Sequence, residues 1–269
     1  MGLKPLRFLP WDRRLIWGST DLDPWFGRRD KRIGEVWHLF PILTKFIFAS
    51  ERLSIQVHPD DDYAWRHEGQ WGKTEMWYVL RAEPGAQIAL GFRETITRER
   101  FRQAALSGEI KELVQWIPIQ AGDTFFIPPG TVHAIGPGAV LCEIQQNCDL
   151  TYRIYDYGRG RDLHVDKATD VAFLGPHPGR STPVDLGEGR KLLASCKYFA
   201  TELIEAGGPL VWAPDEERFH LLIVIEGRGR LGDEPFHPGE CWLIPATAAP
   251  FRLDVDGAVR LLKTYVPEP

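Results

Sequence analysis

Two histidines, a carboxylate and an amide in this sequence could together bind one divalent metal ion. Gln56 and His58 lie in the run Leu53–Asp60, where polar and apolar residues alternate, so a β-strand would point both side chains to one face. Glu75 opens a second apolar run, and His133 follows a turn sequence rich in Gly and Pro. Imidazole, carboxylate and amide groups form the ligand inventory of a divalent metal site that keeps open positions for water or substrate.

The elements expected to position these side chains are mostly β-strands. Seven apolar runs are separated by Gly and Pro at short intervals, which is typical of a β-sandwich or β-barrel. They span residues 35–40, 45–48, 53–58, 76–80, 87–90, 124–127 and 140–145. One stretch differs, because Thr97–Leu106 begins with an N-cap residue followed by good helix formers, and Ile110–Val114 adds a second helical piece. We therefore expect a mostly β domain with a helical insertion near residues 95–115.

A second β-rich block follows a segment rich in Pro and Gly. Residues 173–183 are expected to link a catalytic domain at 1–172 to a second domain at 184–269. The turn sequence Gly-x5-Pro-x-Gly-x2-His that ends at His133 recurs as Gly-x5-Pro-x-Thr-x2-Pro, ending at Pro250. Since proline cannot bind a metal ion, the second block is interpreted as a degenerate copy with a structural role. Covering the active site and forming a dimer are the alternatives.

Composition excludes several classes of protein. The chain of 269 residues, with 43% apolar and 26% charged residues, can bury a large core. A net charge of −5 argues against nucleic acid or an anionic membrane as a partner. No apolar run approaches the roughly 18 residues that span a bilayer, and the N-terminus lacks a signal-peptide pattern. We expect a cytoplasmic protein whose cysteines, without metal or disulfide spacing, are buried thiols: Cys142, Cys148, Cys196 and Cys241.

Several motifs in order carry a family resemblance. The turn sequence ending at His133 meets the spacing of the second cupin signature in full, whereas the first signature is altered. Gln56 stands where a histidine is usual, and Glu75 comes after an insertion. With these departures the chain resembles the mannose-6-phosphate isomerases, in their short bacterial metal-dependent cupin form. The resemblance covers roughly residues 10–170, and the segments that carry it are 56–61, 72–78, 122–135 and 143–158.

The resemblance implies a fold, a cofactor and roles for individual residues. The fold would be a metal-bearing N-terminal cupin (jelly-roll) β-barrel, followed by a degenerate cupin-like barrel. One Zn²⁺ per chain would be bound by four ligands, although other divalent metals are possible: Gln56, His58, Glu75 and His133. Arg153 is implied as the catalytic arginine. Three more residues match functional positions in the family: Lys45, Lys73 and Glu143.

The implied reaction interconverts mannose 6-phosphate and fructose 6-phosphate through an enediol(ate), moving a proton between C1 and C2. It needs a base near the C–H bond, a stabiliser for the oxyanion and cations for the phosphate. Lys73 and Glu143 are both candidates for the base. Lys45 is expected to bind substrate, and Arg153 could bind the phosphate or stabilise the enediolate. We expect a monomer or homodimer with a small sugar phosphate as its partner.

Other classes of protein share parts of this pattern. A cupin oxygenase binds ferrous iron through two histidines and one carboxylate, but the expected pocket is more cationic than an apolar substrate requires. A non-catalytic sugar-binding or regulatory cupin is a third hypothesis, and an isomerase for free mannose or another aldose is a fourth. The remaining histidines are interpreted as core or surface residues: His38, His67, His164, His177, His220 and His237.

Overall fold

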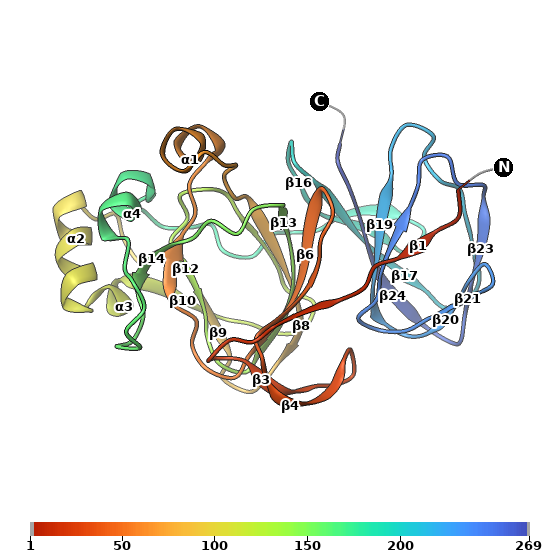
Figure 1. Ribbon diagram of the computed structural model, residues 1–269, viewed down its shortest axis with the longest axis horizontal. Helices are drawn as coiled ribbons and strands as arrows, with labels where there is room; N and C mark the ends of the chain where they lie inside the picture. Colours follow the sequence, from red (N-terminus) through yellow and green to blue (C-terminus); the bar gives the residue numbers. More distant parts are fainter. Residues whose placement is uncertain (1–2, 268–269) are drawn as a thin grey trace.

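Two sheets of the first β-rich block, which precedes residue 173, face each other across the candidate metal-binding and catalytic residues. The computed structural model describes residues 3–267 and is mostly β, as predicted (Figure 1). The six-stranded sheet runs, in spatial order, β11 (Thr124–Ile127), β8 (Glu75–Ala82), β13 (Ala139–Gln146), β6 (Ile42–Ala49), β5 (Glu35–His38) and β2 (Trp11–Arg13). The five-stranded sheet runs β10 (Val114–Pro118), β9 (Gln87–Phe92), β12 (His133–Ile135), β7 (Ile55–Val57) and β14 (Tyr152–Tyr155). A separate hairpin consists of β3 (Ser19–Leu22) and β4 (Gly27–Ile33).

The six-stranded sheet is buried on both faces, which explains its long apolar strands. All eight residues of β6 and all eight of β13 are buried. Along β6, Lys45 and Ile47 line a cavity inside the first block, whereas Phe46 and Phe48 belong to a core shared with the second block. Successive side chains of a strand point to opposite faces. A single strand therefore supplies a charged group to the cavity and apolar groups to the contact between the blocks.

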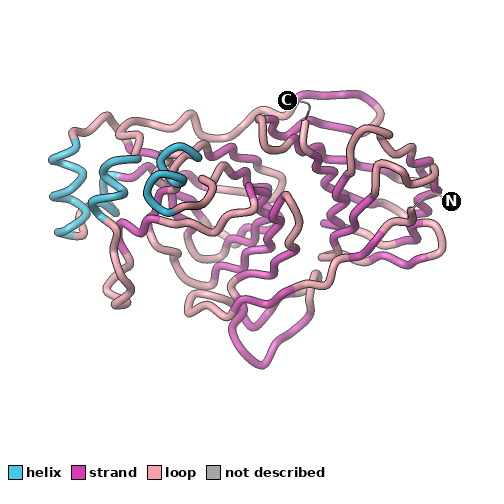
Figure 2. The backbone as a smooth tube through the Cα atoms, turned by 45° about the horizontal axis from the view of Figure 1, so that its top comes forward, coloured by secondary structure: helices cyan, strands magenta, loops and turns pink. Residues whose placement is uncertain are grey.

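Of the four short helices in residues 3–267, the last three in chain order lie at the end of the first block that is far from the second block (Figure 2), whereas the first starts at Asp61, which Tyr198 of the second block contacts. The predicted insertion is confirmed, because the Thr97 hydroxyl accepts a hydrogen bond from the Arg100 N–H at the start of a helix. Two helices were not predicted, namely the first and the last in chain order. The helices are α1 (Asp61–Glu68), α2 (Arg98–Ser107), α3 (Ile110–Leu113) and α4 (Val165–Val171).

The second block also contains two sheets. The seven-stranded sheet runs β1 (Leu6–Arg7), β22 (Cys241–Ile244), β19 (His220–Glu226), β24 (Val259–Tyr265), β17 (Ala200–Ala206), β16 (Arg190–Ser195) and β15 (Val184–Gly187). The smaller sheet runs β18 (Leu210–Trp212), β23 (Phe251–Val255), β20 (Gly229–Leu231) and β21 (Glu234–Phe236). Strands β19 and β22 are antiparallel neighbours in the larger sheet.

The two blocks are joined by a common apolar core. Phe46 and Met76 of the first block share it with Phe199, Leu221 and other buried residues of the second block. The N-terminal strand β1 pairs with β22, so the chain begins on the second block and then crosses to the first (Figure 1). Residues 173–183 lie along the first block, where Phe173 bridges to Thr131. The division of the chain into domains at 172 and 184 stays a prediction.

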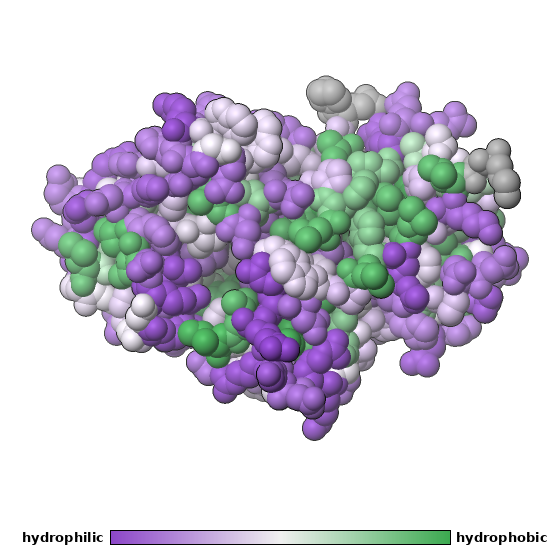
Figure 3. All heavy atoms as spheres, in the orientation of Figure 1, coloured by the Kyte–Doolittle hydropathy of each residue, from purple (hydrophilic) through white to green (hydrophobic). Residues whose placement is uncertain are grey.

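The surface differs in character between the two blocks. In the view of Figure 3, apolar side chains gather over the second block near β1 and β19, whereas hydrophilic side chains cover most of the first block. Leu3 and Leu6 are among the exposed apolar residues. Across residues 3–267, none of the helices combines the length and the apolar character that crossing a membrane requires. All four cysteines are free thiols; three are buried, as predicted, and Cys196 is half-buried.

Candidate metal centre and active site

Three of the predicted metal ligands come together from both sheets of the first block. His58 follows β7 directly, and His133 begins β12, the strand that pairs with β7. Glu75 begins β8 in the opposite sheet. Their candidate ligand atoms all lie within 4.8 Å of one another, and the three side chains are buried. Within the part of the chain that the structure describes, this is the one group of three or more His, Cys, Asp or Glu residues suited to a metal ion.

Backbone carbonyl groups hold both imidazoles in the tautomer that a metal site requires. The Nδ1 atom of His58 lies 2.8 Å from the carbonyl oxygen of Leu150, and that of His133 lies 2.9 Å from the carbonyl oxygen of Thr131. Because a carbonyl oxygen only accepts, each Nδ1 carries the proton and each Nε2 keeps its lone pair. These Nε2 atoms lie 3.7 and 3.4 Å from oxygens of Glu75.

Burial also keeps both imidazoles neutral. It lowers the pKa of His133 to about 4. It also lowers the pKa of His58 well below its usual range, with a further contribution from the ammonium of Lys73. A neutral imidazole binds a metal ion, whereas an imidazolium has no lone pair left for one. Both side chains are therefore ready to act as ligands at neutral pH.

Gln56 lies beside this cluster, with its amide nitrogen 3.2 Å from Nε2 of His133. The carbonyl oxygen of this amide accepts from the hydroxyl of Ser54 at 3.2 Å. A hydroxyl can donate or accept, so Ser54 would also satisfy the Gln56 amide if that amide group were rotated by half a turn. Turned in that way, Gln56 would present an oxygen to the cluster. The structure thus places the predicted fourth ligand next to the other three.

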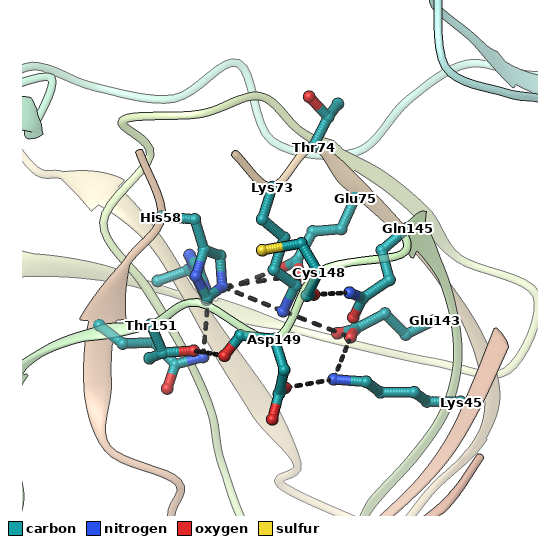
Figure 4. A network of polar contacts seen from close by, with 12 residues as sticks. Lys45, His58, Lys73, Thr74, Glu75, Glu143, Gln145, Cys148, Asp149 and Thr151 are labelled. Atoms are coloured by element: carbon teal, nitrogen blue, oxygen red, sulfur yellow. Dashed lines mark hydrogen bonds and ion pairs between the residues drawn. The ribbon is translucent and has the colours of Figure 1, made fainter. Parts of the chain in front are cut away.

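A network of alternating charges surrounds Glu75 (Figure 4). The ammonium of Lys73 lies 2.7 Å from Glu75 Oε2 and 3.5 Å from Glu143 Oε1. The ammonium of Lys45 lies 3.5 Å from the same Glu143 oxygen and 3.1 Å from Asp149 Oδ1. The other oxygen of Glu143 accepts from the indole N–H of Trp77 at 2.8 Å. All of the side chains in this network except Asp149 are buried.

The pKa values of these groups depend on burial and on the neighbouring charges, which act in opposite directions on Glu143 and Lys73. Burial and the neighbouring carboxylate of Glu143 raise the pKa of Glu75 to about 7, against the lowering effect of Lys73. Burial alone would raise the pKa of Glu143, but the ammonium groups of Lys73 and Lys45 lower it overall. For Lys73, burial acts to lower the pKa, but Glu143 and Glu75 outweigh it and raise the pKa.

The cluster suits a divalent cation. The Oε1 atom of Glu75 is buried without a hydrogen-bond partner, and Oε2 is contacted by the ammonium of Lys73 at 2.7 Å, so the negative charge of this carboxylate is available to a cation. The ammonium of Lys73 lies against Glu75 and, at 3.2 Å, against the Nε2 atom of His58, which shows that this position attracts a positive charge. Two imidazoles with one carboxylate and open positions are a donor set that zinc and other divalent metals accept.

Arg153 lies on β14, which pairs with β7, and Arg153 is directly opposite Gln56 in that pairing. Its backbone is held on both sides by His164, whose N–H donates to the Arg153 carbonyl at 2.7 Å and whose Nδ1 accepts from the Arg153 N–H at 3.1 Å. The guanidinium donates to the carbonyl of Asp162 at 2.8 Å, while its buried Nε has no hydrogen-bond partner. Arg153 therefore keeps donor capacity for an anion.

Most of the predicted residues line one cavity of about 250 Å³, Gln56 and His133 among them but not His58 or Glu75, together with residues that the sequence analysis missed. Lys45, Lys73, Glu143 and Arg153 all contribute to its wall. Arg13 also lines it, with its guanidinium 3.9 Å from Asp149 and stacked over the ring of Trp37. Arg161 lines it as well and is paired with Asp156. No motif marks Arg13, whereas Asp149 and Arg161 lie in or just after the last segment that carried the family resemblance.

The remaining histidines lie outside the ligand cluster, as interpreted from the sequence. His38 is buried between the rings of Phe26 and Phe46, and His220 is buried in the second block beside Trp212. His164 is the one that contributes to the cavity indirectly, through the backbone of Arg153.

Comparison with known proteins decides which family this site belongs to. No protein-family model matches the chain. A mannose-6-phosphate isomerase of Streptococcus mutans is 38% identical over 231 residues, which is 81% of this chain and 72% of that protein. The mannose-6-phosphate isomerase ManA of Bacillus subtilis is 34% identical, with 94% of this chain and 97% of that protein covered. The chain belongs to the mannose-6-phosphate isomerase family.

Solved structures show the same family and fold. The crystal structure of the mannose 6-phosphate isomerase from Bacillus subtilis matches with a TM-score of 0.89 and 29% identity, over 97% of this chain and 99% of that one. A putative mannosephosphate isomerase from Archaeoglobus fulgidus has a TM-score of 0.82 at 20% identity, with 98% of each chain covered, and supports the fold alone. The family resemblance stated from the motifs and the mostly β fold class are thus confirmed.

Proposed function

We propose that this protein is an aldose–ketose isomerase that interconverts mannose 6-phosphate and fructose 6-phosphate in the cytoplasm. The observation that carries this proposal is the match to the Streptococcus mutans mannose-6-phosphate isomerase at 38% identity over 81% of the chain. The buried group of His58, Glu75 and His133 supports it, because an isomerase of this kind needs a charged centre to stabilise an enediolate.

Four residues would hold the metal ion, which we propose to be Zn²⁺. His58 and His133 would bind through their Nε2 atoms, Glu75 through a carboxylate oxygen, and Gln56 through its amide oxygen after a turn of the side chain. The bound ion would supply positive charge that stabilises the oxyanion formed when the substrate loses a proton. Its arrival would require the ammonium of Lys73 to move away from Glu75 and toward Glu143 or the substrate.

Glu143 is our candidate for the base that moves the proton between C1 and C2. Its Oε2 atom is fixed by the indole N–H of Trp77, while its Oε1 atom is buried without a hydrogen bond and forms part of the cavity wall. This arrangement leaves one oxygen within reach of a substrate C–H bond. Lys73, engaged with Glu75 and Glu143, would instead stabilise negative charge on the substrate.

Cationic side chains around the cavity would bind the phosphate. Lys45, Arg13 and Arg161 line the cavity, and Arg153, which has a free donor at Nε, could contact the phosphate as well as stabilise the enediolate. An arginine guanidinium presents several donors that match phosphate oxygens. A phosphate group therefore explains why a protein with a net charge of −5 collects arginines and lysines in this one cavity. The same charges argue against the oxygenase hypothesis, because the cavity is more cationic than an apolar substrate requires.

A coupled assay on mannose 6-phosphate tests the proposal directly. Fructose 6-phosphate should form with purified protein, its formation should stop after chelation, and added Zn²⁺ should restore it. Free mannose serves as the control substrate, because it lacks the phosphate and should react far more slowly. If zinc-loaded protein that remains folded produces no fructose 6-phosphate, the proposed reaction is wrong.

A further inference from the structure

The short segment Gly72–Glu75 supplies Lys73 to the cavity wall and Glu75 to the ligand cluster. Lys73 and Glu75 point toward the ligand cluster, whereas Thr74 between them points away (Figure 4). Hydrogen bonds to the chain around the start of α1 hold this segment. The Lys73 N–H donates to the Pro59 carbonyl at 3.0 Å, and the Gly72 N–H donates to Oδ1 of Asp61 at 2.9 Å.

Gln146 holds the same segment from the end of β13. Its side-chain oxygen accepts from the Thr74 N–H at 2.8 Å, and its backbone N–H donates to the Thr74 carbonyl at 3.2 Å. Its side-chain NH₂ group donates to Oδ1 of Asp61 at 2.9 Å. Asp61 therefore contacts the segment twice, once directly through Gly72 and once through Gln146. The position of this single carboxylate influences where both Lys73 and Glu75 lie.

Tyr198, which belongs to the second block, holds the other oxygen of Asp61. It lies in the turn between β16 and β17, and its hydroxyl donates to Oδ2 of Asp61. The Tyr198 ring packs against the apolar core that the two blocks share. The ammonium of Lys197 adds a weaker contact to the same oxygen at 3.9 Å. A continuous hydrogen-bonded path thus runs from Tyr198 through Asp61 and Gln146 to Thr74.

We propose that Tyr198 is a positioning residue through which the second block aligns Lys73 and Glu75 at the metal centre. The hydroxyl fixes the rotation of the Asp61 carboxylate, and the carboxylate in turn fixes Gly72 and Gln146. The proposal rests on the metal site described under Proposed function. It gives the second block, which lacks a histidine at the repeated turn, a role in the reaction of the first block.

The packing around Gly72 makes the segment sensitive to this alignment. A Cβ atom at Gly72 would lie 2.3 Å from the carbonyl carbon of Asp60, so the segment and the start of α1 are in direct backbone contact. Any rotation of the Asp61 carboxylate that releases the Gly72 N–H would therefore loosen the entry to β8. Glu75 is the first residue of that strand.

The variant Tyr198→Phe tests the proposal, because it removes only the hydroxyl and keeps the ring in the core. Tyr265→Phe is the matched control: it removes a hydroxyl that donates to Glu202 at 3.2 Å, inside the second block and away from the cavity. Zinc affinity would be measured by competition with a chelator. Hydrogen exchange of peptides that cover residues 70–76 would be measured by mass spectrometry on metal-free protein.

Changes to groups that support metal ligands typically lower affinity by roughly 10- to 100-fold. Since Tyr198 acts through two further residues, we expect a smaller loss, of about 3- to 10-fold in zinc affinity. Exchange at Gly72 and Thr74 should rise by about fivefold, as expected for the loss of one supporting hydrogen bond. The control should leave both quantities unchanged, and kcat should fall in Tyr198→Phe with KM nearly constant.

Unchanged zinc affinity and unchanged exchange at residues 70–76 in Tyr198→Phe would overturn the proposal. So would equal effects in Tyr198→Phe and Tyr265→Phe, because they would indicate a general loss of stability. Failure of the wild-type protein to bind zinc would instead contradict the proposed metal site. The exchange measurement on metal-free protein would still decide whether Tyr198 positions the segment.

Discussion

Replacing Arg153 with alanine would separate the two roles considered for its guanidinium. The side chain lines the cavity, and across residues 3–267 no carboxylate of the protein forms an ion pair with it. Burial and the neighbouring Arg161 lower the pKa of Arg153, yet a guanidinium remains charged at neutral pH. Because Nη1 donates to the Asp162 carbonyl and Nε has no partner, an anion in the cavity can still be bound.

The two roles differ in which kinetic constant changes. A hydrogen bond to a charged group contributes about 1.5–3 kcal/mol, so loss of a phosphate contact would raise KM by roughly 10- to 150-fold with kcat preserved. Loss of a group that stabilises the enediolate would instead lower kcat by about 10²- to 10³-fold. We expect the second pattern, with a smaller rise in KM, because Arg153 lies opposite Gln56 beside the metal centre.

Steady-state kinetics on zinc-loaded Arg153→Ala would measure both constants, with zinc content determined on the same sample. The backbone of Arg153 is held by His164, so the truncation should leave the fold and the metal content intact. Arg159→Ala is the matched control, since Arg159 is paired with Asp156 at 2.8 Å and does not line the cavity. Values of kcat and KM within twofold of wild type in Arg153→Ala would refute the role assigned to this residue.

Three further changes test other parts of the structure. Glu143→Gln should keep bound zinc but lower kcat by about 10²- to 10⁴-fold, and should abolish exchange of the substrate C2 proton with solvent; retained exchange would point to Lys73 as the base. His38 has its pKa lowered to about 4 by burial, so its neutral form stabilises the fold above pH 6.5 and that contribution is lost as the pH falls toward 4. Between pH 7.5 and 5 the wild-type protein should therefore lose about 2 kcal/mol more unfolding free energy, measured in urea, than His38→Phe, while the other buried histidines, such as His133 and His220, add the same loss to both proteins. Equal losses in both proteins would contradict this account. A chain that ends at residue 183 should aggregate, because it exposes Phe46 and its neighbours on the outer face of the six-stranded sheet; a soluble fragment that binds zinc would show that the first block folds alone.

The parts of the fold that could be predicted are those with a local signal. The N-cap at Thr97 and the helix formers after it identified α2, and alternation around Gln56 identified β7. The helix α1 had comparable signals, with Asp60 accepting from the Tyr63 N–H and Gly69 in the left-handed conformation after it. It was missed because its eight residues lie in what was interpreted only as an insertion. The helix α4 has no side-chain cap and gave no signal to find.

The parts that could not be predicted depend on contacts between distant residues. Strand β1 has two residues, and its partners in β22 lie more than 200 positions away in the chain. The proposed ligand set followed from motifs, but the carbonyl groups of Leu150 and Thr131 that orient the imidazoles have no side-chain signature. Arg13 was missed for the same reason, since only the folded sheet brings it to the cavity.

The six-stranded sheet explains why a second block without metal ligands would be retained. On β13, Glu143 points into the cavity while Cys142 and Ile144 point into the core shared with the second block. Long buried strands give rigid support to charged groups only if their outer face is covered, because exposed apolar strands associate with other molecules. The second block, which we interpreted from its repeated turn as a degenerate copy of the first, offers its seven-stranded sheet and the shared apolar core for that purpose. Under our proposals the second block needs no metal ligands of its own, because it would serve the first block through apolar area and the contact of Tyr198 with Asp61.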